Sequence, residues 1–411
     1  MMRTILHSDL NNFYASVECI KNPEIKDKPV VVVGSKEDRH GVVLAKNQIA
    51  KELGVRTGDV YWQARQKCGK ELVEVQANHA DYARFSKRVH KIYEQYTDRI
   101  ESFGIDECWL DVTESVALFG GARKLAEELR EHVKRETGLT VSIGVSWNKV
   151  FAKLGSDMKK PDAVTEITKE NYRSTVWKLP VEDLLYVGRA TKEKLNRIGV
   201  YTIGDLARTN EERLISLLGK WGGYLYAYAN GLDESPVAYA AEEEKAKSVG
   251  HSLTTYRDLT CDEDVQLVIR LLADAVCSRM RDMGLEQANT VHVSIRASDL
   301  HWVQKQGKLP HPTSNATEVA KAAFRLYKEV YRWESNVRGV GVALSDFCAD
   351  VRQLDMFGDA VQEEKLKKLD GAIDGLRKKY GNRIIRSAIV YEDPKLRDLD
   401  LDKEPPPEKF F

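Results

Sequence analysis

The sequence predicts a multidomain α+β protein, and three observations support this prediction. At 411 residues the chain is longer than one compact domain usually needs, so we expect two to four folding units. Strand and helix patterns alternate over residues 1–170, whereas residues 171–232 contain short helical patterns and no strand candidate. A second α+β pattern spans residues 248–347, after a polar linker at 233–247, and a polar tail occupies 348–411.

In the first region, runs of apolar residues predict strands, and an apolar period of 3.6 residues predicts helices. The expected elements are, in order, a strand from Ile5 that ends at Asp9, a helix at 13–20, a strand at 30–33, a helix at 80–96, a strand, turn and strand at 100–112, a helix at 118–137, a strand at 141–145 and a helix at 148–158. This alternation is typical of helices that cover a sheet.

In the later regions, Gly188, Gly199 and Gly231 interrupt short helical stretches, which predicts a small all-helical unit. Beyond the linker, the same reasoning predicts helices at 265–283 and 316–331, strands at 290–297 and 337–344, and a last helix at 363–380.

Composition narrows the class of protein. Lys plus Arg and Asp plus Glu both number 63, which excludes a polybasic tail protein and a strong, general nucleic-acid binder. The clear local excess lies in residues 171–232, with nine basic and six acidic side chains. Six scattered cysteines without a CxxC motif predict neither a zinc site nor disulfides. Without a secretory signal or a membrane-spanning apolar run, we expect a cytoplasmic protein with no membrane association.

An acidic constellation is the first candidate site. Asp9 stands where a strand gives way to a loop, and Asp106 and Glu107 stand in the turn between two strand-like runs. Carboxylates at strand ends can converge on Mg²⁺, which prefers hard oxygen ligands. Two such ions about 3.5–4 Å apart stabilise the attacking and leaving oxygens of a phosphoryl displacement. The alternative is an ordinary solvated pair of acids in a turn.

Aromatic and basic side chains form the next candidates. Near a nucleotide, the rings of Phe13 or Tyr14 could exclude a sugar 2′-hydroxyl, or both could be core residues of a helix. Lysines on or after the 148–158 helix could meet triphosphate oxygens, or form a solvated face; they are Lys149, Lys153, Lys159 and Lys160. Gln48, Lys51 and Arg56 have the same two interpretations.

Two further segments suggest macromolecular contacts. The turn at Gly188 leaves backbone amides and a helix N-terminus beside Arg189, Lys192 and Lys194, a plausible non-specific grip on a phosphate backbone. The apolar residues of Gln353-Leu354-Asp355-Met356-Phe357 stand in a polar tail, where they could bind a partner or dock back on the chain.

In combination, five segments resemble the Y-family translesion DNA polymerases, of the bacterial polymerase IV and UmuC-like kind. The segments keep that family's order and spacing over about residues 1–347, and they are HSDLNNFYASVE, GVVLAKNQIAKELGVRTG, FGIDECWLDVT, VSIGVSWNKVFAKLGSDMKKPDAV and VGRATKEKLNRIGV. The resemblance implies a right-hand polymerase with a palm and small fingers within 1–170, fingers at about 11–77, a helix-hairpin-helix thumb at 171–232 and an α+β little finger at 248–347.

The resemblance also implies an activity and its residues. The activity would be template-directed addition of deoxynucleoside triphosphates to a primer, at low fidelity, in DNA repair and damage tolerance. Asp9, Asp106 and Glu107 would be the catalytic carboxylates and ligands of two Mg²⁺ ions, and Leu10 would add its backbone carbonyl. Tyr14 would discriminate against ribonucleotides. Phe13, Lys51 and Lys160 would join it around the nucleotide, and Gly188, Arg189 and Lys192 would hold the primer–template DNA.

This chain departs from the family pattern at three positions. Many members have Tyr and Arg where it has Gln48 and Lys51, and Tyr186 replaces the usual first glycine of the thumb hairpin.

The tail segment resembles the peptide that binds the bacterial sliding clamp, with Gln353, Leu354, Met356 and Phe357 as its anchors. Two other functions stay open: a catalytically silent accessory protein that binds DNA and the clamp, and a nucleotidyl cyclase.

Overall fold

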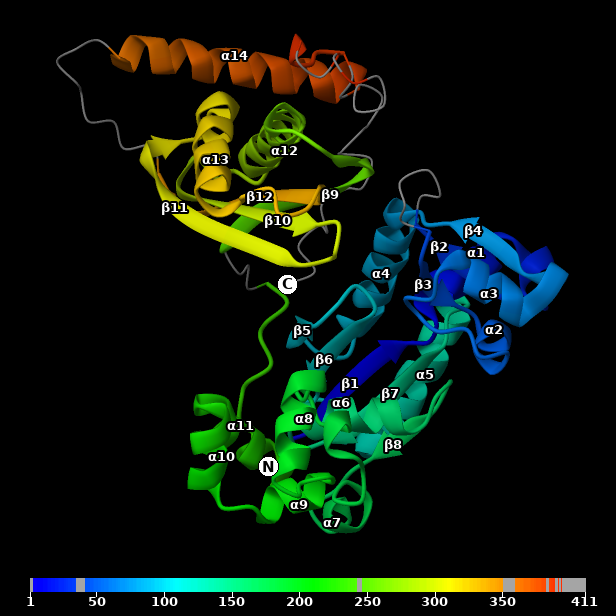
Figure 1. The fold of residues 1–411 in the computed structure, drawn as a ribbon. Helices are drawn as coiled ribbons and strands as arrows, with labels where there is room; N and C mark the ends of the chain where they lie inside the picture. The colour runs from blue at the N-terminus through cyan, green and yellow to red at the C-terminus, as the bar shows by residue number, and fades with distance from the viewer. Residues whose placement is uncertain are drawn as a thin grey trace. The chain divides into compact units, whose positions relative to one another are not determined.

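The computed structural model describes residues 3–34, 41–241, 246–349, 359–381, 384–388, 391 and 393, with the backbone alone for 359–364. These residues form two compact units (Figure 1). Unit 1 contains residues 3–34 and 42–241, and unit 2 contains the described residues from 246 onward.

A five-stranded sheet is the centre of unit 1. Its strand order is β5 (Ile100–Ser102), β6 (Glu107–Asp111), β1 (Ile5–Leu10), β7 (Val141–Ser146) and β8 (Val164–Glu166), and all pairs are antiparallel except β7 with β8. Because side chains alternate along a strand, Leu6 and Leu10 face one side of the sheet and His7 the other. Helices α4 (His79–Tyr93) and α5 (Ala122–Thr137) cover the first side, and α6 (Lys149–Met158) covers the second.

A smaller sheet lies beside it, in the order β3 (Val43–Lys46), β2 (Val30–Val33) and β4 (Val73–Gln76). The helices of this part are α1 (Phe13–Lys21), α2 (Gln48–Glu52) and α3 (Tyr61–Cys68). Unit 1 also has short 3₁₀ turns at Pro23–Ile25, Gly69–Glu71, Val116–Phe119 and Val181–Asp183. The third of these, closed by Gly120, explains why α5 begins at Ala122 rather than at residue 118.

Residues 171–232 are helical, as the sequence predicts, and the described chain has no strand there. The helices are α7 (Tyr172–Thr175), α8 (Arg189–Arg197), α9 (Ile203–Arg208), α10 (Glu211–Leu218) and α11 (Lys220–Ala229). Their core continues into α6 through Val150, Phe151 and Leu154. The Trp147 indole N–H donates to the carbonyl of Gly231 at 3.0 Å, which fixes the end of this helical region to the sheet that precedes it.

The first part of the expected linker is bound to unit 1. Val237 is 2% exposed and packs with Ile5, Trp109 and Ala152. The Ala240 N–H donates to the Asp98 carbonyl at 2.9 Å, and the Ala238 N–H donates to Glu101 at 3.1 Å. We refer to residues 233–241 as the strap. Its single buried valine lies among polar residues, so composition alone does not distinguish it from a free connector.

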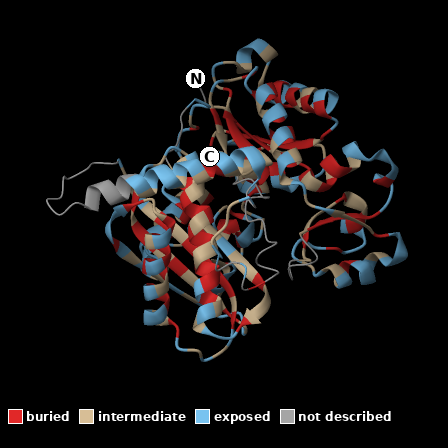
Figure 2. Cartoon of the chain, turned by 90° about the horizontal axis from the view of Figure 1, so that it is seen from above, coloured by how far each residue is buried: buried red, intermediate tan, exposed pale blue. Residues whose placement is uncertain are grey.

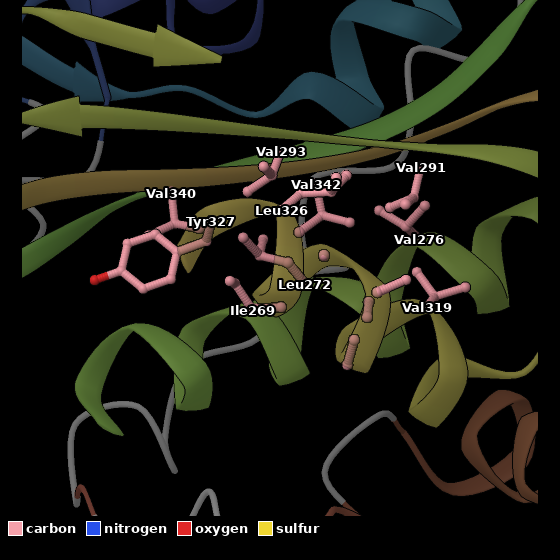
Figure 3. Packing of buried hydrophobic residues seen from close by; sticks show 14 of the residues in the cluster. Ile269, Leu272, Val276, Val291, Val293, Val319, Leu326, Tyr327, Val340 and Val342 are labelled. Atoms are coloured by element: carbon pink, nitrogen blue, oxygen red, sulfur yellow. The ribbon is translucent and has the colours of Figure 1, made fainter. Parts of the chain in front are cut away.

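Unit 2 is a four-stranded antiparallel sheet in the order β11 (Trp302–Thr313), β10 (Gln287–Ala297), β12 (Val337–Cys348) and β9 (Ser248–Leu259). Helices α12 (Asp262–Asp282) and α13 (Ala316–Val330) cover one face, and Figure 3 shows their core, with Leu272, Val293 and Tyr327. A shallow pocket on this sheet is lined by small and polar residues such as Ser252, His292 and Gly341. The sequence analysis missed β9 and β11, because both are edge strands rich in polar residues.

The last described helix, α14 (Asp359–Tyr380), docks on α12. Arg281 pairs with Asp374 at 2.6 Å, and Arg377 pairs with Asp274 at 2.6 Å. Figure 2 shows that most of the described part of α14 is exposed, although Asp374 is buried. Over the described residues, no helix combines the length and the apolar character that crossing a membrane requires.

Candidate active site

The register of the central sheet brings Asp9 and Glu107 together. Asp9 of β1 lies directly opposite Glu107 of β6, and His7 lies opposite Trp109. Directly opposed residues of antiparallel strands project from the same face, so these four side chains share the face that α6 covers. The sequence analysis expected Asp9 at a strand end and Glu107 in a turn. The structure places Glu107 at the first position of β6, where the pairing makes it an immediate neighbour of Asp9.

Asp106 completes the acidic cluster from the turn before β6. The Leu10 N–H donates to the Asp106 carbonyl at 2.9 Å, which fastens this turn to the end of β1. Burial and, after it, the negative charges of Asp9 and Glu107 together raise the pKa of Asp106 to about 6. Gly104 leaves room for the cluster, because a Cβ there would stand 3.4 Å from both an Asp106 carboxylate oxygen and the Glu107 side chain.

Lys160 reaches Asp9 from the loop after α6. Its ammonium lies 2.8 Å from Asp9 Oδ2 and 2.8 Å from Asp157 Oδ1. Burial raises the pKa of Asp9, and the charge of Lys160 partly offsets that rise. The loop is anchored two residues later, where Asp162 accepts ion pairs from Arg130 at 2.6 Å and Lys134 at 2.8 Å. Lys160 is therefore delivered to the carboxylates by a fixed segment.

Glu107 has partners of its own. Lys153 of α6 forms an ion pair with Glu107, and His7 Nε2 lies 3.3 Å from Glu107 Oε2. Burial alone would raise the pKa of Glu107, but His7 and Lys153 outweigh it and lower the pKa to about 2. His7 is itself fully buried, and its Nδ1 lies 2.8 Å from Ser156 Oγ. Burial lowers the pKa of His7. The sequence analysis did not single out His7, because an isolated histidine inside a strand carries no pattern.

The chemistry of the cluster fits divalent cations. Three carboxylates crowd one end of two strands, and hard oxygen donors of this kind are the preferred ligands of Mg²⁺. Ammonium groups stand in for such a cation, because Lys160 pairs with Asp9 and Lys153 with Glu107. Among the residues that the structure describes, no three acidic, histidine or cysteine side chains already form a metal-binding group. Each lysine contacts a single oxygen of its carboxylate, Oδ2 of Asp9 and Oε2 of Glu107.

Tyr14 forms a rigid aromatic wall in the first turn of α1. Its ring stacks on Tyr82 with centroids 4.0 Å apart and planes 12° apart, and His79 meets it edge-on. The Tyr82 hydroxyl donates to Glu18 at 2.9 Å, so the stacking partner is fixed as well. Phe13 is 3% exposed and belongs to the core below. The ring therefore packs as a core residue of unit 1, which was the alternative for Phe13, and its nucleotide-binding role stays a prediction.

The candidate residues at α2 lie on a separate part of unit 1. Lys51 is exposed, and the Gln48 amide donates to Glu52 at 3.0 Å. Burial lowers the pKa of Lys46, and the charge of Lys51 lowers it further, so two ammonium groups stand near each other here. The sequence analysis did not name Lys46. Its position at the end of β3 is the feature of the sequence that could have pointed to it.

The predicted DNA grip is a hairpin between the 3₁₀ turn at 181–183 and α8. Gly188 precedes the first turn of α8, and a Cβ there would meet nothing within 4 Å. Arg189 is 94% exposed, and Lys192 pairs with Glu182 at 2.6 Å. Tyr186 has a φ of +69°, in the region that glycine adopts freely. The backbone thus retains the conformation for which the family's usual glycine is suited.

The predicted clamp contact, at Gln353, Leu354, Met356 and Phe357, lies outside the described residues.

Comparisons with known proteins identify the family. The impB/mucB/samB family model matches residues 8–157, and the model of that family's C-terminal domain matches residues 246–356. A solved Y-family DNA polymerase chimera has a TM-score of 0.75 and 25% identity, and the match covers 84% of this chain and 100% of that one. DNA polymerase IV of Acetivibrio thermocellus is 51% identical over 97% of this chain and 100% of its own length. The chain belongs to the Y-family DNA polymerases.

A second Y-family relative, DNA polymerase IV 2 of Bacillus subtilis, is 36% identical over 94% of this chain and 95% of its own length. The resemblance found in the five segments is therefore confirmed, and so is the α+β right-hand polymerase fold. Membership of the Y family excludes the nucleotidyl cyclase alternative. The roles of individual side chains stay predictions.

Proposed function

We propose that this chain is a template-directed DNA polymerase that adds deoxynucleotides to a primer 3′-hydroxyl by two-metal phosphoryl transfer. Its relatives named DNA polymerase IV support the activity. The single observation that carries the proposal is the convergence of Asp9, Asp106 and Glu107 at one end of β1 and β6. We place the reaction in low-fidelity translesion synthesis, DNA repair and damage tolerance.

The chain's own residues would prepare the reaction in a defined way. When bound, two Mg²⁺ ions would stabilise the attacking and leaving oxygens of the displacement. Asp9, Asp106 and Glu107 would hold them through carboxylate oxygens. Leu10 would contribute its backbone carbonyl, since its hydrocarbon side chain has no ligand atom and lies in the core.

Lys160 and Tyr14 would orient the nucleotide. The Lys160 ammonium, which neutralises Asp9, would transfer to the triphosphate and leave the carboxylate for a cation. Tyr14 lies in the first turn of α1, shortly after β1, and its ring stacks on Tyr82. A ring fixed in this way would exclude a sugar 2′-hydroxyl by steric contact. Lys51 would add charge from α2.

Two macromolecular partners complete the proposal. Gly188, Arg189 and Lys192 would hold the backbone of the primer–template duplex. Gln353, Leu354, Met356 and Phe357 would bind a sliding clamp and tether the enzyme to its template. Deletion of residues 353–357 is expected to abolish stimulation of synthesis by the clamp, and stimulation that persists would place the contact elsewhere.

The decisive experiment is primer extension by the full chain with Mg²⁺, comparing wild type with Asp106→Asn. The substitution keeps the shape of the side chain and removes its charge, so extension should fall by at least about 1,000-fold while duplex binding is retained. Glu114→Gln is the matched control, because Glu114 is a 90% exposed acid in the same unit.

Undiminished extension by Asp106→Asn would contradict the assignment of the site. Wild-type protein that binds the duplex but never extends the primer would support the other candidate function, a catalytically silent accessory protein. That alternative takes its support from the lysines that already occupy Asp9 and Glu107.

A further inference from the structure

Four aromatic side chains form an exposed patch on the helical region of unit 1. Tyr186, Trp221 and Tyr224 are 50%, 45% and 49% exposed, and Tyr228 lies half-buried between them. Ring centroids are 5.3 Å apart for Tyr186 and Trp221, 6.3 Å for Tyr186 and Tyr228, and 5.6 Å for Trp221 and Tyr224. We refer to these four residues as the aromatic patch. Isolated exposed rings are common, but a contiguous group of them indicates an interaction surface.

Tyr186 occupies an unfavourable backbone conformation. At a φ of +69° its Cβ approaches the following carbonyl, a strain that glycine would avoid. Burial does not compensate for the strain, because half of the side chain is exposed. A non-glycine residue that keeps such a conformation indicates a task for the side chain itself.

The patch is continuous with the proposed DNA grip. Tyr186 stands two residues before Gly188, and no side chain caps the N-terminus of α8. The first-turn amides of α8 and the 94% exposed Arg189 therefore adjoin the rings. Residues 171–232 also carry nine basic and six acidic side chains, which suits a polyanion.

We infer that the aromatic patch packs against the deoxyriboses of the duplex strand whose phosphates the hairpin holds. The inference rests on the proposed function and adds a second, uncharged contact to it. Tyrosine and tryptophan rings combine an apolar face with a polar edge, which matches the partly apolar, hydrated surface of a sugar. Sugars are the fitting target, because the bases of a duplex are stacked on one another and the backbone is presented outward.

The test is equilibrium binding of the full chain to a labelled primer–template duplex, by anisotropy, over a series of salt concentrations. Tyr186→Gly removes the ring and suits the local φ, so folding is not at risk. We expect it to raise Kd about fivefold. The slope of log Kd against log salt should stay unchanged, because no phosphate contact is lost. Lys192→Ala should instead reduce that slope.

The matched control is Tyr380→Ala, a 59% exposed tyrosine on α14, which should bind the duplex as wild type does. A Kd for Tyr186→Gly within twofold of wild type would overturn the inference, and so would a loss seen on single-stranded DNA alone. If wild type binds duplex and extends primers while Tyr186→Gly is unaffected, only this inference fails. If the wild-type protein neither binds duplex nor extends primers, the proposed function itself is wrong.

A second measurement does not depend on affinity. Trp221 should change its emission when duplex is added, because its ring would be covered. The difference between wild type and Trp221→Phe isolates that signal from the other tryptophans. A difference spectrum that is the same with and without duplex would contradict contact at the patch.

Discussion

The two large sheets of this protein are covered differently, and the difference shows how each can be used. The sheet of unit 1 is covered on both faces, by α4 and α5 on one side and by α6 on the other. Its acidic side chains Asp9, Asp106 and Glu107 crowd together at one end of β1 and β6. The sheet of unit 2 has helices on one face, and a shallow pocket of serine, histidine and glycine residues on its strands.

Three acidic side chains close together at one end of β1 and β6 suit a chemical step that involves cations. At the end of the first sheet, burial and the neighbouring carboxylates raise the pKa of Asp106. In the second sheet, the pocket residues are mostly neutral and spread over four strands. Such residues suit contact with the surface of another molecule rather than catalysis of bond breaking.

The largest effect is expected where α6 contacts the sheet. A Cβ on Gly144 of β7 would lie 1.8 Å from the Ala152 carbonyl, and α6 cannot move without releasing Lys153 from Glu107. Gly144→Ala should therefore destabilise unit 1 by more than about 3 kcal/mol in chemical denaturation. Gly371→Ala is the matched control, since a Cβ there meets nothing within 4 Å and the position is helical. Equal stability of both variants would contradict the close contact between α6 and β7 at Gly144.

The next effect concerns protons at the carboxylates. With a pKa of about 6, Asp106 is mostly protonated at pH 5 and ionised at pH 7.5. Cations bind the ionised form, so Mg²⁺ affinity measured calorimetrically should fall about tenfold from pH 7.5 to pH 5. Glu107, with a pKa of about 2, stays charged throughout and adds nothing to the change. In Asp106→Asn the fall should be much smaller, and a wild-type affinity that ignores pH would contradict the crowding argument.

The smallest effect is expected in unit 2. Ser252 lies on β9 and lines the pocket, where its side chain contributes little to a core. Ser252→Ala should change the free energy of unfolding by less than about 0.5 kcal/mol. A loss comparable to that of Gly144→Ala would mean that this part of the sheet supports the fold as strongly as the covered one does.

Sequence reasoning reached the parts of the molecule that depend on local pattern. The positions of the three acids were predictable because local patterns mark the strand end at Asp9 and the turn that contains Asp106. Helices α12 and α13 were predictable because their apolar residues repeat with a clear helical period. The partners of the three acids were harder. Lys153 meets Glu107 only because α6 packs on β1, and no local pattern encodes that packing.

Other features escaped for related reasons. The edge strands β9 and β11 are mostly polar, so they lack the apolar runs from which a strand is predicted. The strap depends on the burial of a single valine, Val237. The positive φ of Tyr186 is invisible in the identity of a residue that normally avoids it.

Lys160 and Lys153 give the resting protein a property of their own. Because each already pairs with one carboxylate, the charges of Asp9 and Glu107 are balanced by side chains of the protein itself. The polypeptide then needs no divalent ion to balance these two acids. Ion scarcity would slow such a catalyst without dismantling it, and replenishment would restore its turnover without refolding.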